Sequence, residues 1–214
     1  LALVVRKNRT TKIILYASKS GKYKVLETLK NKKNFYKDVE WIDNITISYL
    51  KEQSGKINIV NYNTFSKRKS FKDLSKFQNI SGYSYNSNKS LIALSGSIDN
   101  QKDIYLLSAT SNNLAKITDD KYDNIYPKFF PNSTSIIFSS NRKGDDENNT
   151  NYLIDDSYNL YIHNLDTTKG APIKVTNSVQ KNIRAYPISG NQIIYSSDIN
   201  GIVNLYNYKI GETH

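Results

Sequence analysis

Short apolar runs, each ending in small polar residues, recur along most of the chain, and each is followed by a turn and a strand-like segment. In these segments apolar and polar positions alternate and Tyr, Ile and Val are common, as in half-buried β-strands. No long window carries the periodicity of an amphipathic helix. The four apolar runs are Ile45–Tyr49, Leu91–Ser97, Ser135–Asn141 and Gln192–Asp198, and the segments that follow them are Lys56–Val60, Asp103–Leu107, Asn159–His163 and Asn204–Tyr208.

These segments repeat with a period near 45 residues. Equivalent positions of the apolar runs are 47, 44 and 57 residues apart, and those of the following segments are 47, 56 and 45 apart. An Asn-Ile pair that precedes three of the runs repeats at steps of 45 and 58. Residues 10–30 form a weaker copy, with Lys12–Tyr16 as the apolar run and Tyr23–Leu26 as the following strand, about 32 residues before the next copy.

In the clearest copy the pattern predicts four strands, at 125–130, 135–141, 159–165 and 172–177. A four-stranded unit that repeats about every 40 to 50 residues is typical of a β-propeller blade, because stacked blades bury the faces that a lone sheet would expose. We therefore predict an all-β fold, a single propeller domain over residues 1–214, built from four to five antiparallel blades. The blades are expected at 1–37 (degenerate), 38–77, 78–120, 121–178 and 179–214 (cut short).

The copy Tyr122–Arg142, followed by Asn159-Leu-Tyr-Ile162, resembles the repeat of the TolB-like β-propeller family, which has TolB-type, WD-like repeats. It has the Pro127-x-Phe129 and Ser-Ser-Asn-Arg142 elements, and the neighbouring copies match in part. The resemblance covers residues 39–214 and implies a six-bladed ring. We therefore expect one or two blades outside this sequence, since it starts with Leu1 in a strand-like run, has no Met and stops at His214 before a fourth strand.

The richness in Tyr, Lys and Asn, together with an acidic segment at 144–157, is similar to that of large envelope TolB-like proteins of the Bacteroidota. This resemblance implies a place in the periplasm, on the outer membrane or at the cell surface. It also implies a protein or peptide partner in an envelope complex, bound by a non-catalytic scaffold. Prolyl-oligopeptidase-like serine peptidases pair a similar propeller with a hydrolase domain, so a peptidase propeller is the alternative, and a glycan-binding propeller is a third.

The composition excludes several kinds of site. Without cysteine the 214 residues cannot form a disulfide framework, a Cys-ligated zinc site or a Cys nucleophile. The longest apolar run, Leu1–Val5, is too short to span a bilayer, so no transmembrane segment is predicted. Of the 30 basic residues 25 are Lys, scattered along the chain, which disfavours nucleic acid as a partner and fits A/T-rich codon usage.

One segment reverses the net charge of +11. Residues 144–157 hold five of the 19 acidic residues and no basic one, which leaves +16 for the rest of the chain. Carboxylates are ligands that Ca²⁺ prefers, although the order of an EF-hand loop is absent. Three interpretations remain: a calcium site, a solvated acidic loop, and an acidic loop that docks on a Lys-rich partner surface. No other cofactor is indicated. The candidate ligands are Asp145, Asp146, Glu147, Asp155 and Asp156.

Catalytic motifs are sparse. There is no Gly-x-Ser-x-Gly elbow, and the two histidines are His163 and the terminal His214. His163 takes a repeat position that Leu107 takes in the preceding copy, which favours a structural role. Because the acidic pairs lie in one loop, they are poor candidates for the two carboxylates of a glycosidase. The sequence therefore favours a protein without catalytic residues of its own.

A binding surface at the mouth of the propeller tunnel is the remaining candidate. The innermost strand of each blade lines the tunnel, and the positions after each Asn-Ile pair are Ser81, Tyr126 and Arg184. A ring of such positions could grip a peptide; the other interpretation is ordinary strand residues. Two further residues are expected to be structural, Trp41 in the core and Arg142 in the Ser-Ser-Asn-Arg element.

Overall fold

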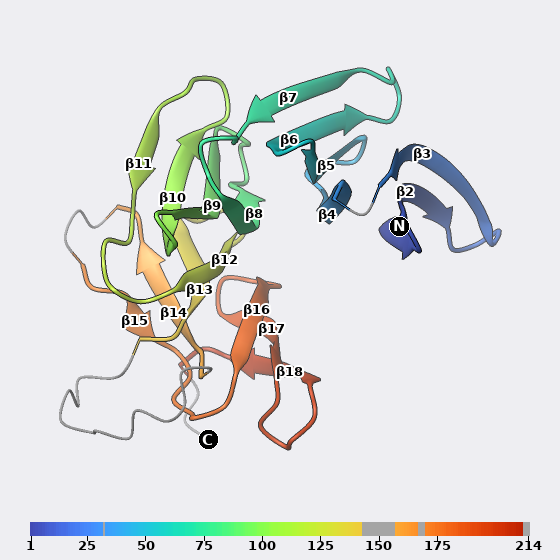
Figure 1. Cartoon of the computed structure of the whole chain (residues 1–214). Helices are drawn as coiled ribbons and strands as arrows, with labels where there is room; N and C mark the ends of the chain where they lie inside the picture. Colours follow the sequence, from blue (N-terminus) through green and yellow to red (C-terminus); the bar gives the residue numbers. More distant parts are fainter. Residues whose placement is uncertain (32, 143–156, 167–169, 212–214) are drawn as a thin grey trace. The chain divides into compact units, whose positions relative to one another are not determined.

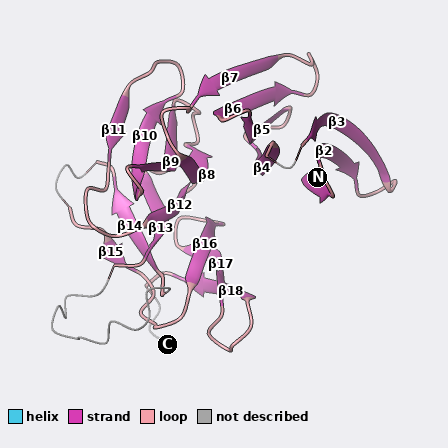
Figure 2. Cartoon of the chain, viewed as in Figure 1, coloured by secondary structure: helices cyan, strands magenta, loops and turns pink. Residues whose placement is uncertain are grey.

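The computed structural model describes residues 1–31, 33–142, 157–166 and 170–211. The regular structure in these ranges consists of β-strands, arranged as five small antiparallel sheets, and the described residues form no helix (Figures 1 and 2). The predicted all-β, propeller-type architecture is therefore confirmed. Contacts divide the chain into two compact units, Leu1–Phe77 and Gln78–His214, here called unit 1 and unit 2.

Unit 1 holds two sheets whose strands pair in the order of the sequence. The first sheet consists of β1 (Ala2–Lys7), β2 (Thr10–Ala17) and β3 (Lys22–Lys30). The second consists of β4 (Phe35–Trp41), β5 (Thr46–Gln53), β6 (Lys56–Asn63) and β7 (Lys69–Asp73). Strand β4 begins three residues before the blade boundary that the repeat predicts.

Unit 2 holds three sheets with the same up-and-down order. The first consists of β8 (Asn79–Tyr85), β9 (Leu91–Ile98), β10 (Gln101–Ser108) and β11 (Leu114–Lys116). The second consists of β12 (Asn124–Phe129), β13 (Ser135–Ser140), β14 (Asn159–Asn164) and β15 (Ile173–Lys174). The third consists of β16 (Asn182–Pro187), β17 (Gln192–Ser197) and β18 (Asn204–Lys209). In the clearest copy all four predicted strands are present, the last shorter than expected.

The first copy of the repeat has a different alignment from the predicted one. The last strand of a complete sheet precedes the first strand of the next, and β3 takes that place before β4. Strand β1 pairs with β2 without a register shift, whereas the first strand of each of the other four sheets is interrupted by one. Strands β1 and β2 therefore take the second and third positions. Both hairpins then close on a two-residue turn, and Thr10 of β2 takes the place of Lys56 of β6, a step of 46 residues, so the predicted alignment of this copy is wrong.

The core of unit 2 lies on both faces of its middle sheet. Ile136 and Phe138 of β13 face the preceding sheet, while Ile137 between them packs against Ala185 and Ile193 of the next. All three β13 side chains are fully buried. Since side chains alternate across a strand, an uninterrupted apolar run serves a sheet that is covered on both faces. Each such side chain stabilises the fold by about 2 kcal/mol.

Neighbouring sheets of unit 2 are also linked by hydrogen bonds between residues 45 positions apart. Lys128 Nζ donates to the carbonyl oxygen of Tyr83 at 3.0 Å, and the Phe129 amide donates to Ser84 Oγ at 3.2 Å. The Asn132 amide donates to Ser87 Oγ at 2.7 Å. The sequence period is therefore also the spacing of contacts between adjacent sheets. A single domain, the blade boundaries and a six-bladed ring stay predictions.

Candidate functional site

The first strand of four sheets is interrupted by a β-bulge at the same place. The pairing register of these strands shifts between Lys37 and Glu40, Ile80 and Gly82, Ile125 and Lys128, and Ile183 and Tyr186. The three predicted rim residues, Ser81, Tyr126 and Arg184, all lie inside these bulges. A bulge leaves residues unpaired and changes the direction of their side chains. The three residues therefore lie where the regular strand pairing is interrupted.

Two of these residues have a left-handed backbone. The φ angle is 55° at Tyr126 and 57° at Arg184, a region that non-glycine residues enter at a cost of about 1 to 3 kcal/mol. The surrounding sheets hold these angles, because the strand is paired on both sides of each bulge. The direction of both side chains is therefore set by the fold.

Tyr126 and Arg184 meet across neighbouring sheets. The Arg184 guanidinium carbon lies 4.2 Å from the centroid of the Tyr126 ring, and Arg184 Nη2 donates to the Tyr126 hydroxyl at 3.2 Å. Arg184 is exposed and Tyr126 half-buried. A guanidinium stacked on an aromatic ring keeps its charge and most of its donors free for a further acceptor.

Gly82, the residue after Ser81, brings β8 close to Tyr126 of β12. A Cβ atom on Gly82 would lie 3.2 Å from Cδ1 and 3.3 Å from Cα of Tyr126, closer than side chains normally approach. The glycine therefore lets β8 and β12 come together at the bulges. We call Ser81, Tyr126 and Arg184 the bulge row. The repeat predicts all three positions, and in the structure Tyr126 and Arg184 contact each other.

A fourth bulge residue was missed from the sequence. Asp38 of β4 has a φ of 52° and lies at the register shift of that strand, in unit 1. The Asn-Ile pair that marks the other bulges is replaced by Tyr36-Lys37, so the motif did not reach this copy. The spacing alone would have found it, since Asp38 lies 43 residues before Ser81.

Arg142 has the structural role that the sequence predicts. Its Nη2 lies 2.6 Å from Asp120 Oδ2 and 3.3 Å from Asn124 Oδ1. Its guanidinium carbon is also 5.0 Å from the centre of the Tyr161 ring. The side chain thus ties the segment before β12 to the middle sheet. Trp41, by contrast, is 44% exposed, so its predicted place in the core is wrong.

A cluster of titratable side chains lies between the two sheets of unit 1. Glu27 of β3 accepts hydrogen bonds from the hydroxyls of Tyr36 at 2.7 Å and Tyr49 at 2.6 Å, and it pairs with Lys69. Burial alone would raise the pKa of Glu27, but the hydrogen bonds from Lys69, Tyr49 and Tyr36 outweigh burial and lower it. Burial, and then the bond to Glu27, raise the pKa of both tyrosines. Both rings are buried, which makes the cluster a link between sheets rather than a catalytic centre.

The described residues do not form the metal or catalytic sites that the sequence suggested. Within the described ranges no three His, Cys, Asp or Glu side chains gather into a possible metal site. The calcium candidates Asp145, Asp146, Glu147, Asp155 and Asp156 lie outside the described residues, as does His214, so a calcium site stays a prediction. Burial, helped by the Arg142 charge, lowers the pKa of His163. His163 pairs with Ile136 in the sheet.

No helix in the part of the chain that the structure describes has the length and apolarity to cross a membrane.

No protein-family model matches the chain, and no curated protein matches it. Solved β-propellers do resemble it. TolB from Acinetobacter baumannii is 16% identical with a TM-score of 0.79, and the match covers 100% of this chain and 51% of that one. This chain therefore spans about half the length of that protein.

Two peptidase structures are similar as well. The match to the β-propeller domain of the Trilobed protease from Pyrococcus furiosus has 15% identity and a TM-score of 0.61, over 99% of this chain and 63% of that one. Dipeptidyl peptidase 4 from Porphyromonas gingivalis is 13% identical with a TM-score of 0.57, over 95% of this chain and 29% of that one. At these identities the similarity shows the fold alone: a propeller of the kind found in TolB and in peptidase propeller domains.

Proposed function

We propose that this chain is part of a non-catalytic, TolB-like propeller scaffold that binds a peptide segment of a protein partner at the bulge row. The observation that carries the proposal is the exposed guanidinium of Arg184, stacked 4.2 Å above the Tyr126 ring on two left-handed bulges. An ordinary strand residue needs neither a strained backbone nor a neighbour's ring to orient it. Strain held at a surface position is common at ligand-binding sites.

The chemistry of the row fits a peptide carboxylate. The guanidinium presents paired donors that match the two oxygens of a carboxylate, and the stacked ring reduces the freedom that the Arg184 side chain would lose on binding. The Ser81 side chain on the adjacent strand adds a hydroxyl that can donate or accept. Residues of this kind, Arg and Tyr above all, dominate the free energy of peptide and protein interfaces.

The test uses a mixed-sequence peptide library with free C-terminal carboxylates, compared with the same library amidated at the C-terminus. The wild-type protein should retain carboxylate peptides more strongly. Arg184→Ala and Tyr126→Ala should each weaken retention about tenfold, while Lys209→Ala, an exposed cation of the same sheet as Arg184, should not. Equal retention by wild type and Arg184→Ala would remove the bulge row from the proposal.

The envelope location and the Bacteroidota origin belong to this proposal by analogy of fold and sequence style only. Six blades in the complete ring and a protein partner are proposed on the same basis. A signal sequence or lipidated cysteine encoded upstream of Leu1 would support the location. Detection of the full-length protein in the cytoplasmic fraction of its native cells would contradict it.

A second candidate function is the propeller of a serine peptidase, favoured by the similarity to the two peptidase structures. In that arrangement the hydrolase domain lies outside this sequence, and the propeller controls access to it. Labelling of the full-length protein by a fluorophosphonate probe would favour the peptidase over the scaffold. Binding of glycans stays a prediction, with no contact among the described residues that favours it over peptides.

A further inference from the structure

The basic charge of the chain is concentrated in unit 1. Residues 1–77 contain 18 Lys and Arg against 6 Asp and Glu, a net charge of +12. Residues 78–214 contain 12 against 13, a net charge of −1. The scattered lysines of the sequence thus belong mainly to one folded unit. A charge of this size on two small sheets attracts anionic partners over several ångströms of solvent.

Three connecting segments of unit 1 lie at one end of its sheets. They join β2 to β3, β4 to β5 and β6 to β7. Thr64, in the last of them, donates through its amide and its hydroxyl to the carbonyl oxygen of Ile45, in the second, at 2.7 and 2.8 Å. A cavity of about 320 Å³ brings Trp41, at the end of β4, together with Tyr16 and Lys22 beside the first segment. We call this surface the loop end of unit 1.

The β6–β7 connection projects an apolar side chain from this end. Phe65 is 87% exposed at the tip of the hairpin. The tip is shaped by Asn63, whose side-chain oxygen accepts the amides of Phe65 at 3.1 Å and Ser66 at 2.8 Å. Lys67, with a φ of 59°, and Arg68 follow directly. The phenyl ring is therefore held out in solvent, and two cationic residues follow it in the same turn.

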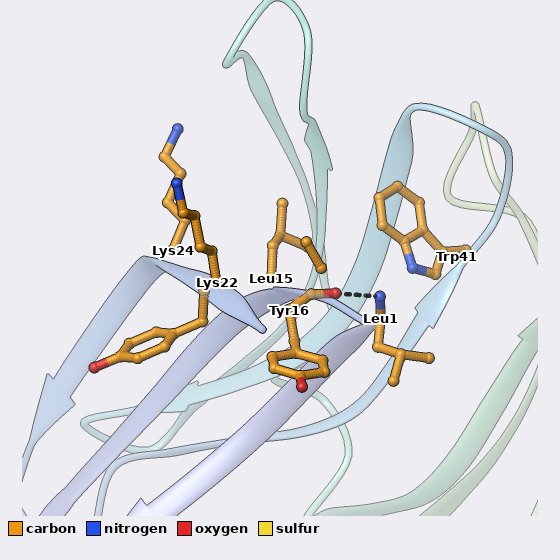
Figure 3. Close-up of a pocket in the computed structure, with 8 residues that line it drawn as sticks. Leu1, Leu15, Tyr16, Lys22, Lys24 and Trp41 are labelled. Atoms are coloured by element: carbon orange, nitrogen blue, oxygen red, sulfur yellow. Dashed lines mark hydrogen bonds between the residues drawn. The ribbon is translucent and has the colours of Figure 1, made fainter. Parts of the chain in front are cut away.

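Other exposed apolar groups accompany Phe65. Ile45 is 47% exposed, Trp41 44% and Tyr23 68%. Figure 3 shows the Trp41 indole on one side of Leu15 and the ammonium groups of Lys22 and Lys24 on the other. The loop end thus presents both aromatic rings and lysines.

We infer that the loop end of unit 1 docks on an anionic phospholipid bilayer. Lysines attract the surface charge of such a bilayer, while aromatic and aliphatic groups enter the zone between headgroups and acyl chains. Phe65 and Ile45 lie on protruding turns, which suits insertion; single-stranded nucleic acid would need stacking platforms in a groove. The 15 Lys and 3 Arg of unit 1 also favour diffuse attraction over the bidentate contacts of nucleic-acid readers.

Unit 2 provides an internal contrast. Its β10–β11 connection, residues 109–113, takes the same place in its sheet as the β6–β7 connection does in unit 1. This segment reads Ala-Thr-Ser-Asn-Asn and has neither a basic nor an aromatic residue. The basic and aromatic loop is therefore not required by the blade fold.

The experiment measures binding of the whole chain to vesicles of phosphatidylcholine with and without phosphatidylglycerol. Trp41 is the only tryptophan and lies at the loop end, so its emission should shift to the blue when the protein docks. We expect binding to the vesicles with phosphatidylglycerol, loss of binding in high salt, and little binding to pure phosphatidylcholine. The inference would be overturned if the protein did not bind the vesicles with phosphatidylglycerol, or if it bound both kinds of vesicle equally.

Variants separate docking from general basicity. Phe65→Ala should weaken binding about tenfold, and Lys67→Ala with Arg68→Ala at least about tenfold. The matched controls are Leu205→Ala, an apolar residue of unit 2 that is 74% exposed, and Lys89→Ala with Lys121→Ala, two exposed lysines of unit 2. If the controls weaken binding as much as the loop variants, the surface is not the one inferred. Tighter binding to a single-stranded oligonucleotide than to the anionic vesicles would assign the surface to nucleic acid instead.

Discussion

Units 1 and 2 are built from the same kind of sheet but differ in net charge, +12 against −1. In both units consecutive strands pair antiparallel, and in both the first strand of a four-stranded sheet carries a bulge at the same position. The fold therefore depends on the pattern of buried apolar residues along the strands and on the bulges. The surface is free to diverge, and here it has diverged into a basic unit and a nearly neutral one.

The two units also differ in what holds their sheets together. In unit 2 the middle sheet is covered on both faces by apolar side chains. In unit 1 the interface between sheets includes a buried carboxylate, Glu27, with two tyrosines and a lysine around it. Unit 2 also has an ion pair between sheets, formed by Lys102 and Asp123, but its carboxylate is 24% exposed against 9% for Glu27. Since exposed pairs contribute less, acid should destabilise unit 1 more than unit 2.

The largest effect is expected from the core of unit 2. Phe138→Ala removes a fully buried ring from β13 and should lower the free energy of unfolding by about 3 to 5 kcal/mol. Urea unfolding followed by circular dichroism measures the total change, and fluorescence of Trp41 reports on unit 1. The Trp41 transition should move less than the one seen by circular dichroism. Equal shifts of both signals would show that the units unfold as one.

Glu27→Gln should destabilise unit 1 by about 2 kcal/mol, because a charge-assisted bond to Lys69 is lost inside the interface. The pKa of Glu27 is lowered by folding, so its contribution is present above the ordinary value of 4.5 and is lost as the pH falls through the folded-state pKa. Trp41 fluorescence in urea at several pH values measures both effects.

The control for Glu27→Gln is a comparison with the wild-type protein at acidic pH. Wild-type unit 1 should lose stability below about pH 4.5, while Glu27→Gln should be less sensitive there. An identical acid response of the two proteins would mean that the Glu27 carboxylate does not stabilise the interface.

Gly82→Ala should cost unit 2 about 1 to 3 kcal/mol, because the added methyl group meets Tyr126 and forces β8 and β12 apart. The Gly82 backbone itself tolerates alanine, so the cost arises from the close approach of the strands and not from strain at residue 82. Circular dichroism in urea measures it. The control is Gly190→Ala, whose added methyl group contacts nothing, and a similar loss there would refute the explanation.

The sequence reveals the repeat because buried strands must alternate or run apolar, and these patterns survive even where the exposed residues change. It also places Tyr126 and Arg184 at equivalent positions. It cannot show that they touch, since their contact depends on two bulges in different sheets. The first copy was misaligned for a similar reason: β1 and β2 match the second and third strands of later copies, and the structure reveals this because β1 lacks the bulge of the other first strands. Alignment with Tyr83 and Phe129 of the later copies predicted Trp41 in the core. Trp41 is the last residue of β4, and its side chain lines a surface cavity instead.

The smallest expected effect is that of the net charge of each unit on its own stability. Like charges within unit 1 repel, and salt screens them, since the Debye length falls from about 10 Å at 0.1 M to about 3 Å at 1 M. In urea, added sodium chloride should therefore stabilise unit 1 by up to about 1 kcal/mol, as seen through Trp41, and unit 2 by less. The triple variant Lys22→Gln, Lys24→Gln and Lys33→Gln should weaken the salt response of unit 1, since it lowers the net charge of the unit from +12 to +9. A triple variant that keeps the wild-type response would mean that the net charge of unit 1 acts on binding partners and not on its own stability.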